Sequence, residues 1–195
     1  MQKKSRAECR RERLRTKDIV PLSEKIKPFF SFRHPVTRFC LVFLALLIAF
    51  SLFLFQKSAE RYFTIPITSL IASQAAWVLK VLGMKVYTRG IIISGEGFSV
   101  EILGNCNAIF EIGLYLSAVI AFPAKLKEKV LGGILGIIFI YCLNLLRIVF
   151  LFLVGVYAPQ HFEESHVYVS QTIFIIVVSF FWLLWVGKWV KSTVQ

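Results

Sequence analysis

The chain lacks the residue patterns of the common metal sites and disulfide frameworks. It has only three histidines, and its four cysteines have no paired spacing: Cys9, Cys40, Cys106 and Cys142. No Cys-x-x-Cys or Cys/His pattern occurs, so a disulfide framework, a bound metal and a cofactor are not expected. Gly-x-Ser-x-Gly and His-Glu-x-x-His are also missing, which leaves serine-elbow and zinc proteases without support.

Acidic residues are scarce as well. The chain has 11 Asp and Glu against 23 Lys and Arg, a net charge of +12, and yet it is 57% hydrophobic. A soluble domain rarely combines so high a net charge with so high a hydrophobic content, whereas a small polytopic membrane protein commonly does. The basic run Lys3–Lys17 has no zinc-finger, RNP or helix-turn-helix signature beside it, so we expect contact with anionic lipid headgroups and no nucleic acid.

Four hydrophobic stretches are long enough, or nearly so, to cross a hydrocarbon layer of roughly 30 Å at about 1.5 Å per residue. They cover residues 37–55, 106–123, 131–154 and 166–186. The first starts too late for a signal peptide and lacks a small-x-small cleavage pattern, so it is expected to be a retained anchor. The sequence therefore predicts an all-α polytopic membrane protein with about four transmembrane helices.

Two further segments lie between the first two spans. Residues 63–84 are apolar but include Pro66, Gln74 and Lys80, and they predict an amphipathic helix on or in the outer leaflet. Residues 86–103 contain two strand-like runs on either side of Ser94-Gly95-Glu96-Gly97, which predicts a small extramembrane β-hairpin.

The distribution of basic charge predicts the domain division and the orientation. Residues 1–38 hold 12 Lys and Arg against 4 acids, the loop 124–130 holds three lysines, and the loop 155–165 holds none. The positive-inside rule then places both termini and the three-lysine loop in the cytoplasm. We expect residues 1–36 to be a disordered basic cytoplasmic extension and 37–190 to be the membrane domain.

Three residues stand where an ordinary membrane helix would not have them: Cys106, Arg147 and His166. Under the predicted orientation all three lie near the outer face. An arginine inside an apolar helix is expensive and is a functional hypothesis by default. A cysteine at a helix N-terminus, beside Arg⁺ and with an imidazole base at hand, is expected to have a lowered pKa and to act as a nucleophile. The alternative for Cys106 alone is a small buried hydrophobic residue.

Several residues are expected to support these three. Asn105 is a candidate N-cap of the second span, and Asn144 lies on the same helix face as Arg147. Glu111 is a candidate ion-pair partner of Arg147, and with Glu101 it could instead orient His166. His161 is a competitor for the role of His166, but it lies in the middle of a loop.

A family resemblance appears at this point. The chain resembles the exosortase/archaeosortase membrane transpeptidases, most closely the compact exosortase H subgroup, over roughly residues 38–188. The matching motifs are Gly104-Asn105-Cys106-Asn107, Ala121-Phe122-Pro123, Asn144-Leu145-Leu146-Arg147-Ile148 and His166-Val167-Tyr168. Ala108, where the family often has Gly, and the long basic extension depart from the pattern.

The resemblance implies a thiol transpeptidase of the bacterial inner membrane with its active site at the outer face. Its substrates would be exported proteins with a C-terminal sorting signal of a short motif, a hydrophobic helix and a basic cluster. Cys106 would form a thioester, Arg147 would stabilise the thiolate or oxyanion, and His166 would transfer protons before the acyl group passes to an unknown acceptor nucleophile. We expect the substrate helix to dock where Gly132, Gly133 and Gly136 permit close approach.

A non-enzymatic membrane transport or assembly subunit, with Arg147 as a gate, is the competing hypothesis. It predicts that Cys106 is dispensable. The sequence shows no inverted repeat and no paired broken helices, so this alternative ranks below the transpeptidase.

Overall fold

The computed structural model describes residues 35–104 and 106–190. The chain divides into two compact units, residues 1–42 and 43–195, and every element discussed after the first helix lies in the second unit. The first described helix, α3, covers Pro35–Leu54 and has no buried residue. The predicted basic extension, residues 1–36, lies almost entirely outside the described residues.

The described chain is mostly helical, and four of its helical stretches are long and apolar enough to cross a membrane. These are residues 35–54, 57–81, 126–157 and 159–188. The prediction of a polytopic helical membrane protein is therefore confirmed. The second predicted span differs in length, because α6 (Ile109–Ala121) has only 13 residues. At about 1.5 Å per residue, α6 is roughly 20 Å long.

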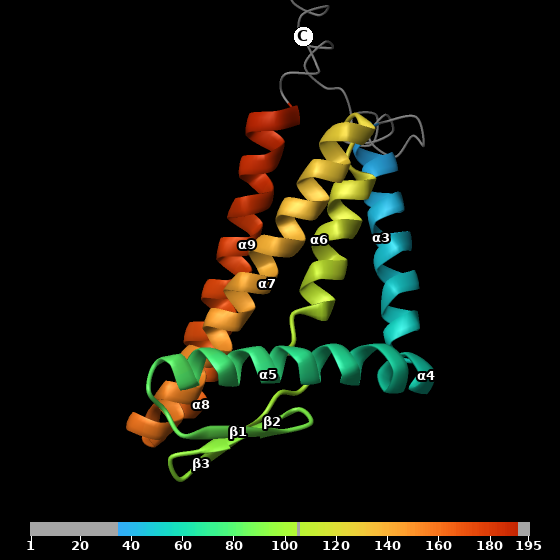
Figure 1. Ribbon diagram of the computed structural model, residues 1–195. Helices are drawn as coiled ribbons and strands as arrows, with labels where there is room; N and C mark the ends of the chain where they lie inside the picture. The colour runs from blue at the N-terminus through green and yellow to red at the C-terminus, as the bar shows by residue number, and fades with distance from the viewer. Residues whose placement is uncertain (1–34, 105, 191–195) are drawn as a thin grey trace, which may run out of the picture. The chain divides into compact units, whose positions relative to one another are not determined.

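The segment between the first span and the sheet is one continuous helical stretch. It consists of α4 (Lys57–Ala59), the π-helical turn η1 (Glu60–Thr64) and α5 (Ile65–Val81). Figure 1 shows α5 crossing the ends of α6 and α7 that lie next to the sheet, instead of running alongside them. One side of α5 is buried and the other exposes Leu70 and Trp77. The helix is thus long enough to span, but it has the direction expected for the predicted surface helix.

The helix α7 (Leu126–Tyr157) is the longest element and connects the two ends of the second unit. Its 32 residues correspond to about 48 Å, which exceeds the hydrocarbon thickness. Near the sheet, Phe152 packs edge-to-face on Phe98, with ring centroids 5.6 Å apart. The chain then passes through η2 (Pro159–His161) and α8 (Phe162–Glu164) to the last span. That span is formed by η3 (Ser165–Gln171), α9 (Thr172–Trp185) and η4 (Val186–Val190).

The predicted substrate-docking face on α7 is wrong, because the protein's own helices already occupy it. A Cβ on Gly132 would lie 2.1 Å from the Trp185 ring, and one on Gly136 would lie 2.0 Å from the Tyr115 ring. The Tyr115 hydroxyl donates to the Gly132 carbonyl at 3.0 Å. The small residues therefore allow α6 and α9 to pack closely against α7.

The hairpin predicted at 86–103 is present and belongs to a three-stranded antiparallel sheet. The strands are β1 (Val86–Arg89), β2 (Ile92–Gly95) and β3 (Phe98–Glu101), in the order β1-β2-β3. The β2–β3 turn has positive φ at both central positions, 50° at Glu96 and 78° at Gly97, as a type I′ turn requires. Sequence patterning missed β1, because Val86 is its only buried residue and no alternation is visible.

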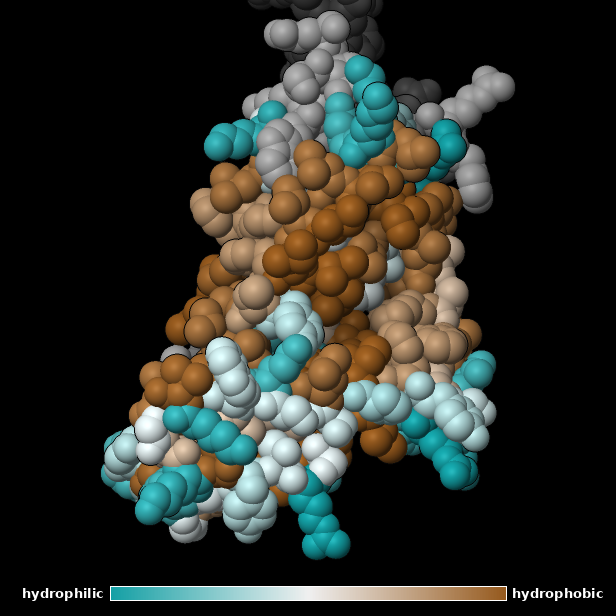
Figure 2. All heavy atoms as spheres, viewed as in Figure 1, coloured by the Kyte–Doolittle hydropathy of each residue, from teal (hydrophilic) through white to brown (hydrophobic). Residues whose placement is uncertain are grey.

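Two apolar clusters hold the second unit together. The first joins α5, the sheet and α7, and the second joins α6, α7 and α9. On the face in Figure 2, hydrophobic side chains cover the middle of the helices, and hydrophilic ones gather toward the sheet and at the opposite end. The loop that connects β3 to α6 lies where the two clusters meet, since Cys106 packs on the first and Ala108 belongs to the second.

Candidate active site

The loop between β3 and α6 holds Cys106 between a backbone hydrogen bond and the anchored side chain of the next residue. The N–H of Cys106 donates to the Leu103 carbonyl at 2.9 Å. The next residue, Asn107, is only 1% exposed. Its Nδ2 donates to Thr68 Oγ1 on α5 at 2.9 Å, and its Oδ1 accepts from the N–H of Ile109 at 3.0 Å. The position of the cysteine is therefore fixed from a neighbouring helix.

The start of α6 corrects two expectations. The helix begins at Ile109 with Ala108, at φ 58°, as its N-cap residue, so Cys106 precedes the first helical turn. The predicted cap, Asn105, lies outside the described residues. The Oδ1 atom of Asn107 instead accepts a hydrogen bond from the N–H of Ile109 in the first turn, as an Asn side chain commonly does at the start of a helix. The reason is the left-handed residue Ala108, which delays the helix.

The structure brings Cys106 and His166 together. Their Sγ and Nε2 atoms are 3.0 Å apart, although the residues are 60 positions apart in the sequence. His166 lies on η3, and its ring is parallel to the Phe162 ring at a centroid distance of 6.0 Å. The competitor His161 is exposed and contacts Glu164 at 3.4 Å instead. A nucleophile and a base within hydrogen-bond reach are the arrangement that thiol catalysis needs.

Arg147 lies on α7, 6% exposed, with its guanidinium 5.4 Å from the centre of the Phe174 ring. Because α7 continues to Tyr157, Arg147 is ten residues from the helix end, or about 15 Å, which is deeper than the predicted span implied. Its charge acts on both Cys106 and Glu111. In these apolar surroundings the positive charge of Arg147 is weakly screened, so it acts more strongly on the thiol than it would in water.

The expected depression of the thiol pKa is not found. Burial raises the pKa of Cys106 above its ordinary value, and the negative charge of Glu111 raises it further, while Arg147 opposes both. Burial outweighs Arg147 because low-dielectric surroundings disfavour the charged thiolate itself. The thiol is therefore expected to be protonated at neutral pH.

Asn144 and Glu111 supply polar atoms inside the helix bundle. Asn144 is 1% exposed, and within residues 35–104 and 106–190 neither its Nδ2 nor its Oδ1 has a hydrogen-bond partner. The Oε2 atom of Glu111 is in the same situation. Buried polar atoms are normally satisfied, so these atoms are unusual within an apolar helix bundle.

A cavity of about 320 Å³ gives access to the Cys106–His166 pair. It lies between the sheet and the start of the last span. Its lining residues are Phe98, Ser99, Val100, Glu101, Ile102, Leu103, Cys106, Ile148, Leu151, Phe162, Glu163 and His166. Its volume lies at the lower end of the range of ligand-binding clefts, about 300–1,000 Å³.

The fold and this site define a polytopic helical membrane protein with a paired thiol and imidazole at one end of its helix bundle. A comparison with protein-family profiles matches residues 32–185 to the transmembrane exosortase family (Exosortase_EpsH). The chain therefore belongs to the transmembrane exosortases, as its motifs predicted. Searches of curated proteins and of solved structures found no match.

Sequence reasoning missed the anchoring pair Asn107 and Thr68. Asn107 was part of the motif around the cysteine, but no role was predicted for its side chain. Thr68 is 39 positions away, in a helix read as a surface element, and no local pattern links the two. Their relation depends on α5 packing against the loop.

Proposed function

We propose that this exosortase is a membrane-embedded cysteine transpeptidase that cleaves C-terminal sorting signals of exported proteins. The observation that supports it most directly is the 3.0 Å contact between Cys106 Sγ and His166 Nε2. A merely structural cysteine has no need of an imidazole at this distance, beside a cavity that a peptide can enter.

The proposed reaction has two steps. Cys106 transfers its proton to His166 and attacks the scissile carbonyl, and the C–N bond breaks as the imidazolium protonates the leaving amine. The product is a thioester between Cys106 and the N-terminal part of the substrate. His166 then removes a proton from the acceptor nucleophile, which attacks the thioester and releases the thiol.

Arg147 stabilises negative charge in this mechanism, either on the thiolate or on the oxyanion of the tetrahedral intermediate. Its effect on the thiol is directly opposed by Glu111. Asn144, one helical turn away with free donor and acceptor atoms, can share that task. We assign Arg147 an electrostatic role and Asn144 a supporting role, whereas Glu111, expected from the sequence to support the site, moderates the effect of Arg147 on the thiol.

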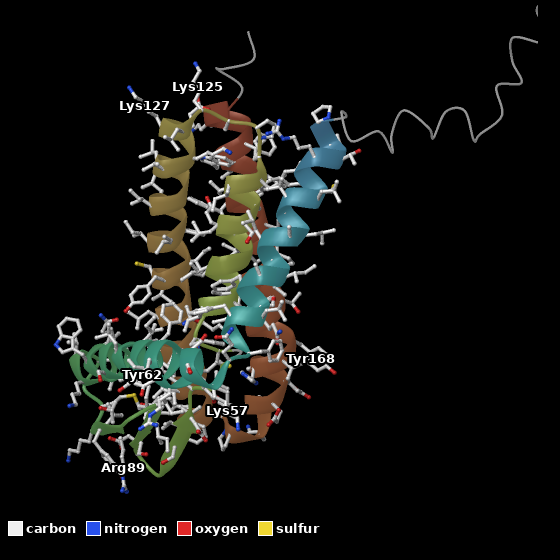
Figure 3. All side chains as sticks on the ribbon, turned by 90° about the vertical axis from the view of Figure 1, so that its right-hand side faces the viewer. Lys57, Tyr62, Arg89, Lys125, Lys127 and Tyr168 are labelled. Carbon is white, nitrogen blue, oxygen red and sulfur yellow. The ribbon has the colours of Figure 1, made fainter. Side chains whose placement is uncertain are left out.

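The proposed orientation puts the site at the outer face of the bacterial inner membrane, with both termini in the cytoplasm. Figure 3 shows Lys125 and Lys127 at one end of α7 and Arg89, on the sheet, toward the other. The lysine loop and the candidate site therefore lie at opposite ends of the second unit. The positive-inside rule assigns the lysine end to the cytoplasm.

The proposal is tested by processing in cells. A protein with a motif–helix–basic tail is coexpressed with wild type, Cys106→Ala, Cys106→Ser, Arg147→Ala and His166→Ala, and its C-terminus is read by mass spectrometry. Wild type is expected to remove the tail, and Cys106→Ala to leave it intact. Cys142→Ala, which changes an exposed cysteine on α7, is the matched control and should process normally.

Normal processing by both Cys106 variants would refute the thiol mechanism. It would favour the competing hypothesis of a transport or assembly subunit that depends on Arg147. The mass of the trimmed terminus separates hydrolysis from transfer to an acceptor.

A further inference from the structure

The strand β3 has one open edge. The N–H of Ile102, just after the strand, donates to the Ile91 carbonyl at 3.0 Å, and this bond sets the alternation of the ladder. In an antiparallel pair every second residue directs both backbone groups to the same neighbour. The backbone N–H and C=O groups of Val100 and Phe98, two and four positions before Ile102, therefore point to β2. The N–H and C=O groups of Ser99 and Glu101 point away from β2, to the open edge.

This edge borders the cavity that contains the thiol and the imidazole. Every residue from Phe98 to Leu103 lines the cavity, and Phe162 and Glu163 form part of the facing wall. Among residues 35–104 and 106–190, no backbone hydrogen bond crosses from that wall to Ser99 or Glu101. An unpaired strand edge is a template for another extended chain.

We propose that the substrate's sorting motif binds as a fourth β-strand along the open edge of β3, which leads its scissile bond to Cys106. This inference rests on the function proposed above and specifies how the substrate is recognised. The occupant is an extended peptide segment that precedes a hydrophobic helix. Main-chain hydrogen bonds to Ser99 and Glu101 hold it, and the cavity receives alternate side chains.

The length of the edge limits the recognised segment. β3 has four residues, about 13 Å at roughly 3.3 Å per residue. Beyond it, the Leu103 carbonyl is already used by the N–H of Cys106, so pairing ends where the nucleophile begins. The structure thus fits a motif of about four residues immediately before or across the cleaved bond.

The charge of the cavity limits the composition of the motif. Among the residues that the structure describes, its lining includes the carboxylates of Glu101 and Glu163 and no Lys or Arg. Like charges repel in such a site, so acidic motif residues are disfavoured and neutral or basic ones are accepted.

Disulfide crosslinking tests the pairing. A full-length enzyme without native cysteines, with Cys106 replaced by Ala, carries a single cysteine as Ser99→Cys or Glu101→Cys. The partner is a tripartite-tail protein with one cysteine at each of six consecutive positions before its hydrophobic helix, and copper–phenanthroline is the oxidant. Thr88→Cys is the matched control, because Thr88 is exposed on β1 and lies at the opposite edge of the same sheet.

Strand pairing predicts a two-residue pattern. The best substrate partner for Ser99→Cys should differ by two positions from the best partner for Glu101→Cys, with weaker crosslinks at the positions between them. Thr88→Cys should give background only. Crosslinks without this shift, or crosslinks no stronger than those of Thr88→Cys, would overturn the proposal.

Proline substitution supplies a functional test with Cys106 intact. Ser99→Pro removes an edge N–H without breaking the backbone ladder of β2 and β3, and edge positions tolerate proline. It also removes the hydrogen bond from Ser99 Oγ to Ser94 Oγ at 2.8 Å, so its rate is compared with that of Ser99→Ala, which loses only this side-chain bond. At low substrate level the processing rate of Ser99→Pro should fall roughly fivefold, the effect of one lost hydrogen bond. Thr88→Pro should process at the wild-type rate, and equal rates for Ser99→Pro and wild type would count against strand pairing. If Cys106→Ala still processes the tail, the proposed function fails whatever the crosslinks show.

Discussion

The anchor between α5 and the cysteine loop makes a quantitative prediction. Thr68 is 2% exposed, accepts from Asn107 Nδ2 at 2.9 Å and donates to the Thr64 carbonyl at 2.8 Å. Thr68→Val keeps the shape of the side chain and removes the hydroxyl. The Nδ2 atom of Asn107 then remains buried without its acceptor, which costs about 1–3 kcal/mol.

That cost falls on the conformation of the loop and not on the apolar clusters. A loss of about 2 kcal/mol corresponds to a roughly 30-fold change in the population of the anchored loop. We therefore expect Thr68→Val to reduce processing about 10- to 30-fold while the protein remains folded. Asn107→Ala should reduce it further, because it also removes the acceptor for the Ile109 N–H.

The assay compares the processing rate, the alkylation rate of Cys106 and the thermal unfolding of the purified protein in detergent. Ser73→Ala is the matched control, since the exposed Ser73 hydroxyl donates to the Ser69 carbonyl at 3.0 Å on the same helix. It should change the free energy of unfolding by less than about 0.5 kcal/mol and leave the processing rate unchanged. If Thr68→Val processes as fast as Ser73→Ala, the anchor does not position the nucleophile.

Two further predictions follow from the electrostatics and the packing. Because burial and Glu111 both raise the pKa of Cys106, its alkylation rate should rise with pH around a midpoint above the ordinary thiol value, and Glu111→Gln should move that midpoint to lower pH. An unchanged or higher midpoint in a pH series of iodoacetamide labelling would show that Glu111 does not act on the thiol. Gly136→Ala should destabilise the protein by about 1–3 kcal/mol, because its Cβ would overlap the Tyr115 ring, whereas Gly133→Ala, whose Cβ would have its nearest neighbour at 3.4 Å, should unfold at nearly the wild-type temperature.

Hydrophobic runs and motif spacing determined the class of protein. Apolar segments of this length are typical of transmembrane helices, so the helical membrane architecture was predictable from the sequence alone. The β2–β3 hairpin was also predictable, because Glu96-Gly97 between two apolar runs has the chemistry of a tight turn. Cys106, Arg147 and His166 were singled out because their types are unusual at those positions.

Local patterns were less informative about where elements end and what they pack against. Asn105 was the expected cap, yet Ala108 adopts a left-handed conformation and the helix starts at Ile109. Nothing in the residue types signals this, because it depends on Asn107 being held by α5. The glycines of α7 were expected to face a substrate, and only the packed rings of Tyr115 and Trp185 show that they face inward.

The sequence by itself determined that this is a helical membrane protein and that Cys106, Arg147 and His166 stand at unusual positions in or beside its apolar segments. Both follow from composition along the chain, which needs no knowledge of contacts. Only the tertiary structure decided that Cys106 meets His166 and not His161, that burial raises the pKa of the thiol, and that β3 presents an open edge beside it. These properties arise from groups far apart in the sequence, whose distance, burial and hydrogen bonding exist only after the chain has packed.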